Sequence, residues 1–397
     1  MPCRPLLLAL TATALAAQEA PRPDEDALAL LDTPVKVAAS KALSTRTAPG
    51  IVSLISREEI LASGAADLLE VLRLVPGFDF ASDVQGVVGP AVRGNWAFEG
   101  KVLLLVDGHE LNETRFGTLA FGHHFPVDPI QRIEIIRGPG SAMHGGFAEL
   151  AVVNVITRQG ADLMGFAGSV SYGRSARAEV YRQWNAAYGT VQGETTWSAS
   201  ATVGEGFRSE APWRSFGRVR ELRGQSGLRS GLFSMAVEHG GFSLRLLHDD
   251  HDLDDFTWYH SDLGPSPMRF RGTYAEVKQE LRWGTSLRVT PLVRFKRQEP
   301  WYYPDDLEGG KRTTERTTVG VQASWDPNRD LSLQMGGEAW QDVGRAPLSQ
   351  AWADGGTRVH YESHAVHAQA LWSAPFALVT VGARYDHNSQ FGSSFVP

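Results

Sequence analysis

Two patterns of apolar positions divide the sequence near residue 160. Before that point, short apolar runs alternate with segments of helical spacing, and the runs predict strands at residues 51–55, 102–106, 132–136 and 152–157. Ser56 and Glu59 form a capping box ahead of a helix that Gly64 ends, and a second helical pattern ends at Pro76-Gly77. This region predicts a small α/β domain, for which an ordinary periplasmic domain is the simplest alternative.

After about residue 165 the helix signals disappear, and apolar and polar residues alternate with a period of two. Val319, Val321 and Trp325 share one face of a predicted strand, whereas Thr318 and Ser324 share the other. The same alternation predicts eleven strands, at 165–173, 177–188, 191–203, 229–238, 241–249, 273–283, 286–297, 313–325, 330–341, 359–372 and 376–386. Other strands place Arg, Lys, Glu and Gln on the polar face. We therefore expect that face to meet water and the opposite face to meet an apolar medium.

The predicted connections between these strands alternate in length. Short turns fall near 188–190, 239–241, 283–286, 326–329 and 373–375, and long polar stretches fall near 204–228, 250–272, 298–312 and 342–358. This alternation is typical of an outer-membrane β-barrel, and Trp283, Trp325, Trp372 and Tyr385 fit an interfacial girdle. A soluble sandwich or propeller is the alternative, although no blade motif repeats. Because bacterial single-chain barrels close with an even number of strands, eleven strands predict a fragment or a truncated gene product.

The N-terminus has the features of a Sec-type signal peptide over residues 1–17. Arg4 precedes a short apolar run that ends in the small residues Ala14-Leu15-Ala16. Cys3 is the only cysteine and would leave with the signal peptide, so the exported chain would form neither disulfides nor thiolate metal sites.

Charge and motifs exclude several classes of function. The net charge of −7 argues against a nucleic-acid partner. The glycines of segment 138–146 do not form a phosphate-binding loop, because the required Lys and Ser/Thr are absent and Met143 breaks the dinucleotide spacing. No catalytic motif is evident, so we predict no enzyme, catalytic residue or cofactor; an exported enzyme with a β-rich body is the alternative.

Histidines and acidic residues gather in two places. Segment 248–255, His-Asp-Asp-His-Asp-Leu-Asp-Asp, contains metal-ligand types, but we predict a solvated loop there and no metal site. His123 and His124 lie between two predicted strands, and Val84 and Gln85 lie within segment 80–89. These four residues are our candidates for ligand contact.

The α/β region contains five motifs whose order and spacing resemble those of TonB-dependent outer-membrane receptors. They are Asp67-Leu68-Leu69-Glu70-Val71-Leu72 with Val75-Pro76-Gly77, Val92-Arg93-Gly94, Leu103-Leu104-Leu105-Val106-Asp107-Gly108, the run from Arg132 to Ala142 followed by Gly145, and Val153-Asn154-Val155-Ile156-Thr157. The residues that match the plug motifs most specifically are Arg93, Gly94, Asp107, Gly108, Arg132, Glu134, Arg137, Gly138, Gly140 and Gly145. The resemblance extends over essentially all of the chain after the signal peptide.

The resemblance implies an α/β plug domain inside an antiparallel transmembrane β-barrel of 22 strands, of which eleven would be half. The implied organisation is a signal peptide (1–17), a periplasmic segment with a TonB box (18–48), a plug domain (49–160) and a partial barrel (161–397). It implies active uptake of a scarce nutrient across the cell outer membrane, above all an iron–siderophore, with cobalamin or haem next. TonB with the ExbB–ExbD complex and the outer-membrane lipid are the implied partners. A binding-only receptor or a passive porin is the alternative function.

The candidate TonB box is Asp32-Thr33-Pro34-Val35-Lys36-Val37, which would pair with TonB as an added strand. Lys36 departs from the usual apolar residue, and a plain linker is the alternative. The short distance from the signal peptide to this box leads us to expect a transporter rather than a signal transducer. Arg93, Arg132, Glu134 and Arg137 could contact the barrel wall or form ordinary salt bridges within the plug.

Overall fold

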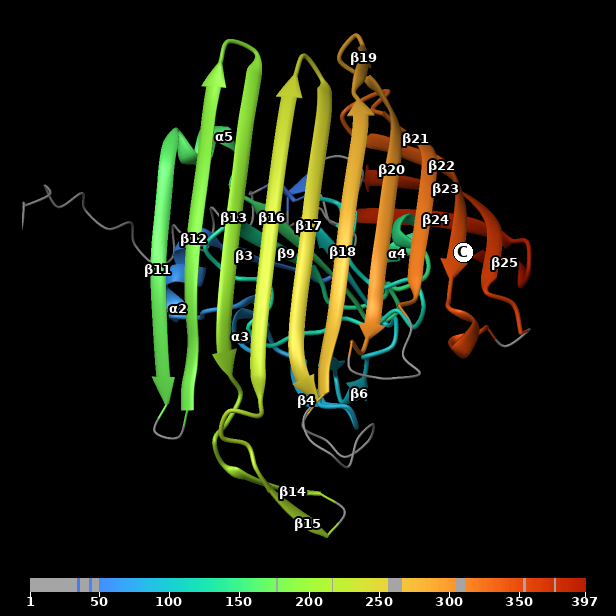
Figure 1. The fold of residues 1–397 in the computed structure, drawn as a ribbon. Helices are drawn as coiled ribbons and strands as arrows, with labels where there is room; N and C mark the ends of the chain where they lie inside the picture. Colours follow the sequence, from blue (N-terminus) through green and yellow to red (C-terminus); the bar gives the residue numbers. More distant parts are fainter. Residues whose placement is uncertain are drawn as a thin grey trace, which may run out of the picture.

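The computed structural model describes residues 34–35, 43–44, 50–175, 178–215, 217–255, 266–304, 311–352, 355–374 and 376–397. One large antiparallel sheet dominates the fold, and smaller sheets lie on one side of it (Figure 1). The predicted signal peptide lies outside the described residues. So does most of segment 18–48, where β1 (Pro34–Val35) pairs with β2 (Leu43–Ser44).

The α/β region has two sheets, and we call residues 50–163 the plug. Their strand orders are β3-β9-β10-β7-β8 and β4-β5-β6. The elements of the plug are β3 (Val52–Ser56), α2 (Arg57–Ser63), α3 (Leu68–Leu72), β4 (Phe78–Ser82), β5 (Val88–Val92), β6 (Asn95–Trp96), β7 (Val102–Val106), β8 (His109–Glu110), β9 (Ile130–Ile136), α4 (Ser141–His144), β10 (Ala151–Thr157) and α5 (Gly160–Leu163). All four predicted strands are confirmed, whereas the sequence analysis missed the sheet β4-β5-β6.

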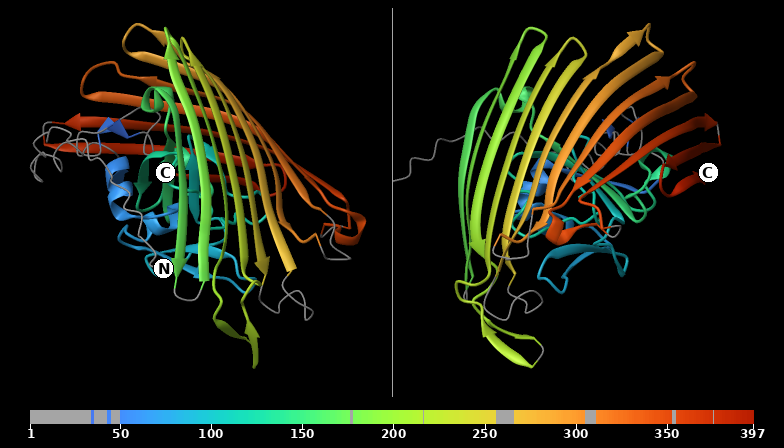
Figure 2. Two further views of the ribbon diagram at one scale, coloured as in Figure 1. Left: turned by 60° about the vertical axis from the view of Figure 1, so that its left-hand side comes forward. Right: turned by 45° about the vertical axis from the view of Figure 1, so that its right-hand side comes forward.

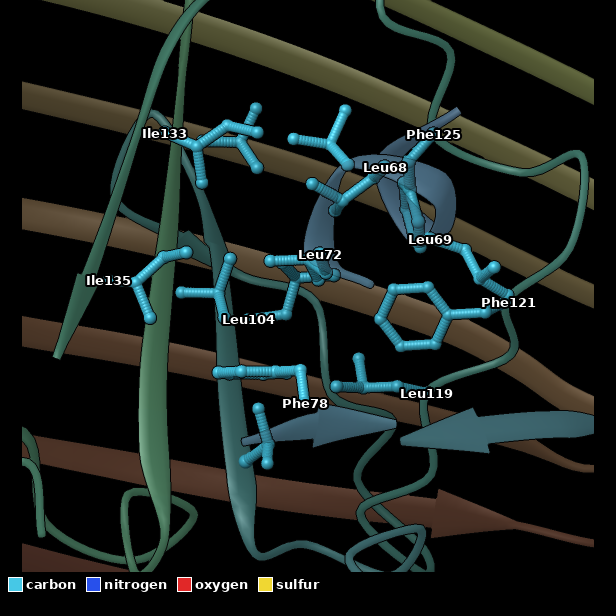
Figure 3. Close-up of a cluster of buried hydrophobic side chains, with 14 of the residues drawn as sticks. Leu68, Leu69, Leu72, Phe78, Leu104, Leu119, Phe121, Phe125, Ile133 and Ile135 are labelled. Carbon is cyan, nitrogen blue, oxygen red and sulfur yellow. The ribbon is translucent and has the colours of Figure 1, made fainter. Parts of the chain in front are cut away.

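The plug has an apolar core of its own. Ile133 and Ile135 of β9 face Leu104 of β7 and Leu68 and Leu72 of α3, and all five are buried (Figure 3). Helix α2 begins with the predicted capping box of Ser56 and Glu59 and ends at Gly64, whose φ is 69°. No helix in the described ranges is long and apolar enough to cross a bilayer.

The large sheet, which we call the wall, curves around the plug as an open shell (Figure 2). Its strands are β11 (Gly165–Ser175), β12 (Ala178–Gln192), β13 (Thr195–Phe207), β16 (Gly227–His239), β17 (Phe242–Asp255), β18 (Ser266–Gln279), β19 (Leu281–Trp283), β20 (Leu287–Tyr302), β21 (Thr313–Trp325), β22 (Leu331–Arg345), β23 (Arg358–Ala374), β24 (Ala377–Asn388) and β25 (Gly392–Val396). A hairpin of β14 (Pro212–Ser215) and β15 (Arg218–Glu221) projects beyond the strand ends, and the 3-10 helix η1 (Leu348–Gln350) follows β22. β11 and β25 are the edges of the sheet in the described part of the chain.

The two faces of the wall differ as the alternation predicted. Val319 and Val321 are 58% and 44% exposed on the outer face, whereas Thr318 is buried on the inner face, which lies against the plug. Lys296 and Arg384 are also buried on the inner face. An apolar outer face and a polar inner face are the arrangement of a transmembrane barrel.

All eleven predicted strands are confirmed, but two connections were placed wrongly. The turn predicted near 188–190 falls instead at Gly193 and Glu194, because β12 continues to Gln192. Gly189 is needed for close packing, since a Cβ there would lie 2.8 Å from the Cα of Gly160 in α5.

Segment 248–255 is also not a loop, because it lies within β17. Its acidic residues alternate between the faces of the sheet, and Asp250 and Asp252 form ion pairs with Arg271 and Arg269 of the adjacent β18. These cross-strand ion pairs explain how so polar a segment remains a strand. The sequence analysis also missed β25.

Candidate functional site

A cavity of about 870 Å³, which we call the vestibule, lies between the plug and the ends of the wall strands. Figure 1 shows β4 and β6 of the plug at the same end of the molecule as the hairpin β14–β15. Its lining combines aromatic side chains with two arginines and, on the plug side, two acidic residues: Trp96, Phe98, Phe116, Trp213, Trp301, Tyr303, Arg115, Arg312, Asp83 and Glu99. A volume of this size suits a large ligand, and flat aromatic surfaces with a few charged groups are typical of ligand pockets.

Arg115 is positioned by a tight turn of the plug. The Glu113 carboxylate accepts hydrogen bonds from the backbone N–H groups of Arg115, Phe116 and Thr118, at 2.7, 2.7 and 3.3 Å. Asn112 is buried before this turn and bonds the backbone of β7, with Oδ1 accepting from Leu104 N at 2.9 Å. The turn is therefore anchored to the core of the plug.

The two vestibule arginines repel each other. Burial lowers the pKa of Arg115, and the positive charge of Arg312 lowers it further. Burial also lowers the pKa of Arg312. The Arg115 guanidinium lies 4.2 Å from the centre of the Phe116 ring, over the ring face. An anion placed between the two guanidinium groups would relieve their repulsion.

Trp301 at the end of β20 forms the aromatic side of the vestibule. Its φ of 55° coincides with a register shift between β18 and β20. The indole packs edge-to-face on Phe270 at 5.0 Å and on Phe98 of the plug at 6.1 Å between ring centroids. The buried Nε1 of Trp301 has no hydrogen-bond acceptor among the described residues. The indole thus links plug and wall through aromatic contacts.

Away from the vestibule, polar contacts connect the plug to the inner face of the wall. His124 is buried, and its ring nitrogens lie 2.7 Å from Asp249 Oδ1 of β17 and 2.6 Å from the carbonyl oxygen of Ala120. Its ring stacks on that of His251 at a centroid distance of 4.2 Å. Burial opposes protonation of His124, but Asp249 outweighs this effect and raises the pKa of the imidazole.

Glu110 of β8 forms a second contact with the wall. Its Oε1 lies 2.6 Å from Lys296 Nζ and 3.5 Å from Arg316 Nη1. Burial would raise the pKa of Glu110, but the two cations outweigh burial and lower it. The carboxylate is therefore ionised at neutral pH and attached to β20 and β21.

Asp107 and Asp128 form further contacts with other parts of the wall. Asp107, which has a φ of 50°, accepts hydrogen bonds from Thr157 and lies 3.3 Å from Arg245 of β17. Asp128 accepts from Ser169 of β11 at 2.7 Å and from Gln183 of β12 at 3.0 Å. Polar contacts thus run from β11 to β21 along the inner face of the wall.

Arg93, Arg132, Glu134 and Arg137 were expected to contact the wall or to form salt bridges within the plug, and the side chains of Arg93, Arg132 and Glu134 bond within the plug. Arg132 Nε donates to Glu134 Oε1 at 2.9 Å, and Arg93 Nη2 donates to the carbonyl oxygen of Arg137 at 2.8 Å. Gly94, which has a φ of 77°, follows Arg93 in a turn. Glu110, Asp128 and the partner of His124 were missed, because contacts with the wall join residues far apart in the sequence.

The glycines of the motifs allow turns and close packing. Gly108 and Gly138 have positive φ angles. A Cβ on Gly140 would lie 2.4 Å from the Cβ of Ala148, so only glycine fits there. A Cβ on Gly145 would lie 2.8 Å from the guanidinium of Arg384 in β24, so this glycine lets the plug approach the wall.

The candidate ligand contacts divide into two groups. Val84 and Gln85 line the vestibule, and Gln85 Nε2 donates to the Tyr303 hydroxyl at 3.0 Å. His123 and His124 lie at the plug–wall contact, where the carbonyl oxygen of His123 accepts from Ser230 at 2.7 Å. Of the candidate TonB box, Pro34 and Val35 are in β1, and Asp32, Thr33, Lys36 and Val37 lie outside the described residues. The described residues contain no cluster of three metal-ligand side chains that could hold a metal ion.

Comparison with known proteins assigns the plug. Residues 44–152 match the family model of the TonB-dependent Receptor Plug Domain. Over 128 residues the chain is 35% identical to the vitamin B12 transporter BtuB of Vibrio vulnificus (strain CMCP6). The aligned residues make up 32% of this chain and 21% of that protein.

Solved structures match both the plug and the wall. A mutant of the ferric enterobactin receptor PfeA of Pseudomonas aeruginosa is 18% identical, with a TM-score of 0.67, over 88% of this chain and 59% of that one. The siderophore receptor PirA of Acinetobacter baumannii is 15% identical, with a TM-score of 0.66, over 87% of this chain and 57% of that one. The chain spans less than two thirds of the length of these relatives. Residues 44–152 are thus a plug domain of the TonB-dependent receptor type, and the wall shares the fold of the solved siderophore receptors.

Proposed function

We propose that the chain forms the plug and part of the barrel of an outer-membrane transporter that takes up an iron–siderophore complex. The vestibule is the observation that carries this proposal. Its aromatic side chains offer flat surfaces, and Arg115 and Arg312 offer positive charge. Many ferric siderophores are large anions with planar rings, so stacking and charge would act on the same ligand.

In this proposal the plug closes the barrel until transport begins. Many of its contacts with the wall are hydrogen bonds and ion pairs, such as those of Glu110 with Lys296 and of Asp128 with Gln183, beside an apolar cluster around Val87 and Phe98. Water can replace such polar partners when the plug moves, whereas an apolar interface would have to expose its surface to water. The plug therefore combines an apolar core, which preserves its fold, with an interface whose polar part can exchange partners with water.

TonB would supply the force for this movement, energised by ExbB–ExbD and the proton gradient. We propose segment 32–37 as the site where TonB pairs as an added strand. The short pairing of Pro34 and Val35 with β2 supports this, because it shows that this backbone can form a strand. The transporter would be placed in the outer membrane through a signal peptide at residues 1–17 and would have no catalytic role.

Cobalamin is the second candidate ligand, because the plug is similar to that of a vitamin B12 transporter. That similarity covers 32% of the chain, whereas Trp301, Tyr303 and Arg312 of the vestibule come from the wall. The wall side of the vestibule therefore favours an anionic, ring-containing ligand over cobalamin. Haem would share the aromatic contacts and is the third candidate.

Binding to the full-length receptor tests this assignment. Ferric enterobactin and cyanocobalamin would be titrated against the purified protein, with intrinsic tryptophan fluorescence as the signal. We expect ferric enterobactin to bind and Arg115→Gln to weaken binding about tenfold, which corresponds to about 1.4 kcal/mol. The matched control is Arg132→Gln, which removes a plug arginine outside the vestibule lining. Tighter binding of cyanocobalamin, or equal effects of the two variants, would contradict the proposal.

A further inference from the structure

The hairpin β14–β15 joins the wall through a narrow neck. Arg208 N donates to the carbonyl oxygen of Ser226 at 3.0 Å, across the base of the hairpin. The fully buried Ser226 reinforces this pair, because its hydroxyl donates to the carbonyl oxygen of Ser209 at 2.8 Å and accepts from Ser209 N at 3.2 Å. The position of Arg208 therefore fixes the base from which the hairpin projects.

The Arg208 side chain extends from this neck to the plug. Its Nη1 donates to the carbonyl oxygen of Gly86 in the plug, and its Nη2 donates to the carbonyl oxygen of Asp254 in β17 at 3.2 Å. Burial lowers the pKa of Arg208 to about 10, against the opposing effect of Asp254, Asp255 and Asp83. The guanidinium is therefore charged at neutral pH, and its planar fork connects two backbone segments at once.

Gly86 belongs to the plug loop 83–87, which reaches the vestibule. Asp83 Oδ1 closes this loop by accepting from Gln85 N at 2.9 Å and from Val87 N at 2.8 Å. Val87 is fully buried in a cluster that includes Leu228, Leu253 and Met268 of the wall, whereas Val84 is 62% exposed. The loop thus presents Asp83, Val84 and Gln85 to the vestibule, while the wall holds its backbone at Gly86.

We propose that Arg208 is a positioning residue that couples the vestibule loop 83–87 to the hairpin β14–β15. Loop and hairpin both line the vestibule, through Val84 and Trp213. A ligand that shifts the loop moves Gly86, and the shared guanidinium transmits the shift to the neck of the hairpin. The inference rests on the proposed function, because it treats the vestibule as the ligand site.

Spin-label mobility on the full-length receptor, without any ligand, tests the coupling. A nitroxide at Val219→Cys reports on the exposed tip of the hairpin, and Cys3 is the only other cysteine of this sequence. We expect Arg208→Gln to increase label mobility and Asp83→Ala, which loosens the plug loop, to increase it as well. Because both changes break the same connection, Asp83→Ala should add nothing when Arg208→Gln is already present.

The matched control is Arg223→Gln. Arg223 lies in the same segment between β13 and β16, but its side chain is 80% exposed and lies 3.9 Å from Glu210. This substitution should leave label mobility unchanged. The coupling would be overturned if the two changes had additive effects on label mobility. It would also be overturned if Asp83→Ala alone left label mobility unchanged. The Asp83→Ala measurement decides the question even if Arg208→Gln prevents folding. Because the experiment contains no ligand, its failure is distinguishable from failure of the siderophore proposal.

Discussion

His124 of the plug and Asp249 of the wall are separated by 125 residues in the sequence, yet their side chains lie 2.7 Å apart in a buried contact. The contact joins the loop between β8 and β9 to the middle of β17. It is one of the polar links that hold the plug against the wall, and its strength depends on the charge of the imidazole.

The His124–Asp249 contact predicts a dependence of plug docking on pH. His124 faces Asp249 and His251 of β17 and the more distant Asp67 of the plug. Since the folded state raises the His124 pKa above its usual value of 6.5, the stabilisation is fully present below about 6.5 and is lost as the pH rises through the raised pKa. An NMR titration of the histidine rings should give His124 a midpoint above 6.5, and Asp249→Asn should lower it.

Asp250→Asn is the control for this titration, because Asp250 forms its ion pair with Arg271 and not with the plug. This substitution should leave the midpoint of the His124 titration unchanged. A His124 midpoint below 6.5 in the unmodified receptor would show that burial, rather than Asp249, determines its charge.

Gly140→Ala should destabilise the plug. The added Cβ would lie 2.4 Å from the Cβ of Ala148 and 2.5 Å from Val152 Cγ2, so β10 would have to shift. We expect a loss of about 1–3 kcal/mol in the free energy of unfolding, measured by denaturant titration. Gly146→Ala, where no atom lies within 4 Å of the new Cβ, should change it much less. Equal losses for the two variants would refute the packing argument.

Glu110→Gln should weaken the attachment of the plug to β20 and β21. The change leaves the buried Lys296 without its carboxylate partner, which we expect to cost about 1–3 kcal/mol. Hydrogen exchange of the plug amides in the full-length receptor would measure the loss as faster exchange. Glu205→Gln removes a carboxylate whose side chain is 50% exposed and should leave plug exchange unaltered. Unchanged exchange after Glu110→Gln would mean that this ion pair does not hold the plug.

Val319→Arg tests whether the outer face of the wall meets lipid. An arginine near the middle of the bilayer should destabilise the folded protein in lipid vesicles by about 2–4 kcal/mol. Val319→Leu keeps the apolar contact and should have little effect. An arginine variant as stable as the leucine variant would place this face in water.

The sequence predicted the wall better than it predicted the site. A period of two is visible in each strand alone, so all eleven strands and both faces could be inferred locally. Gly189 misled the turn assignment, because a glycine required for packing on α5 is indistinguishable in sequence from one required for a turn. Segment 248–255 misled the loop assignment, because its ion-pair partners lie in the next strand.

Within the site, Val84 and Gln85 were identified from their place in a plug loop. Trp301 and Arg312 were missed, because they fall in a stretch predicted as a long loop. The plug–wall contacts could not be predicted for another reason. They depend on how the plug and the wall face each other, and no local sequence pattern records that orientation.

Uptake of iron by cells tests the central claim most directly. Cells that produce the full-length receptor, and lack other receptors for the ligand, would be given radioactive iron as ferric enterobactin, with and without a protonophore. We predict accumulation that stops with the protonophore and after deletion of residues 32–37, while binding at the cell surface persists in both cases. Accumulation that continues without the proton gradient or without residues 32–37 would contradict TonB-dependent transport through this protein.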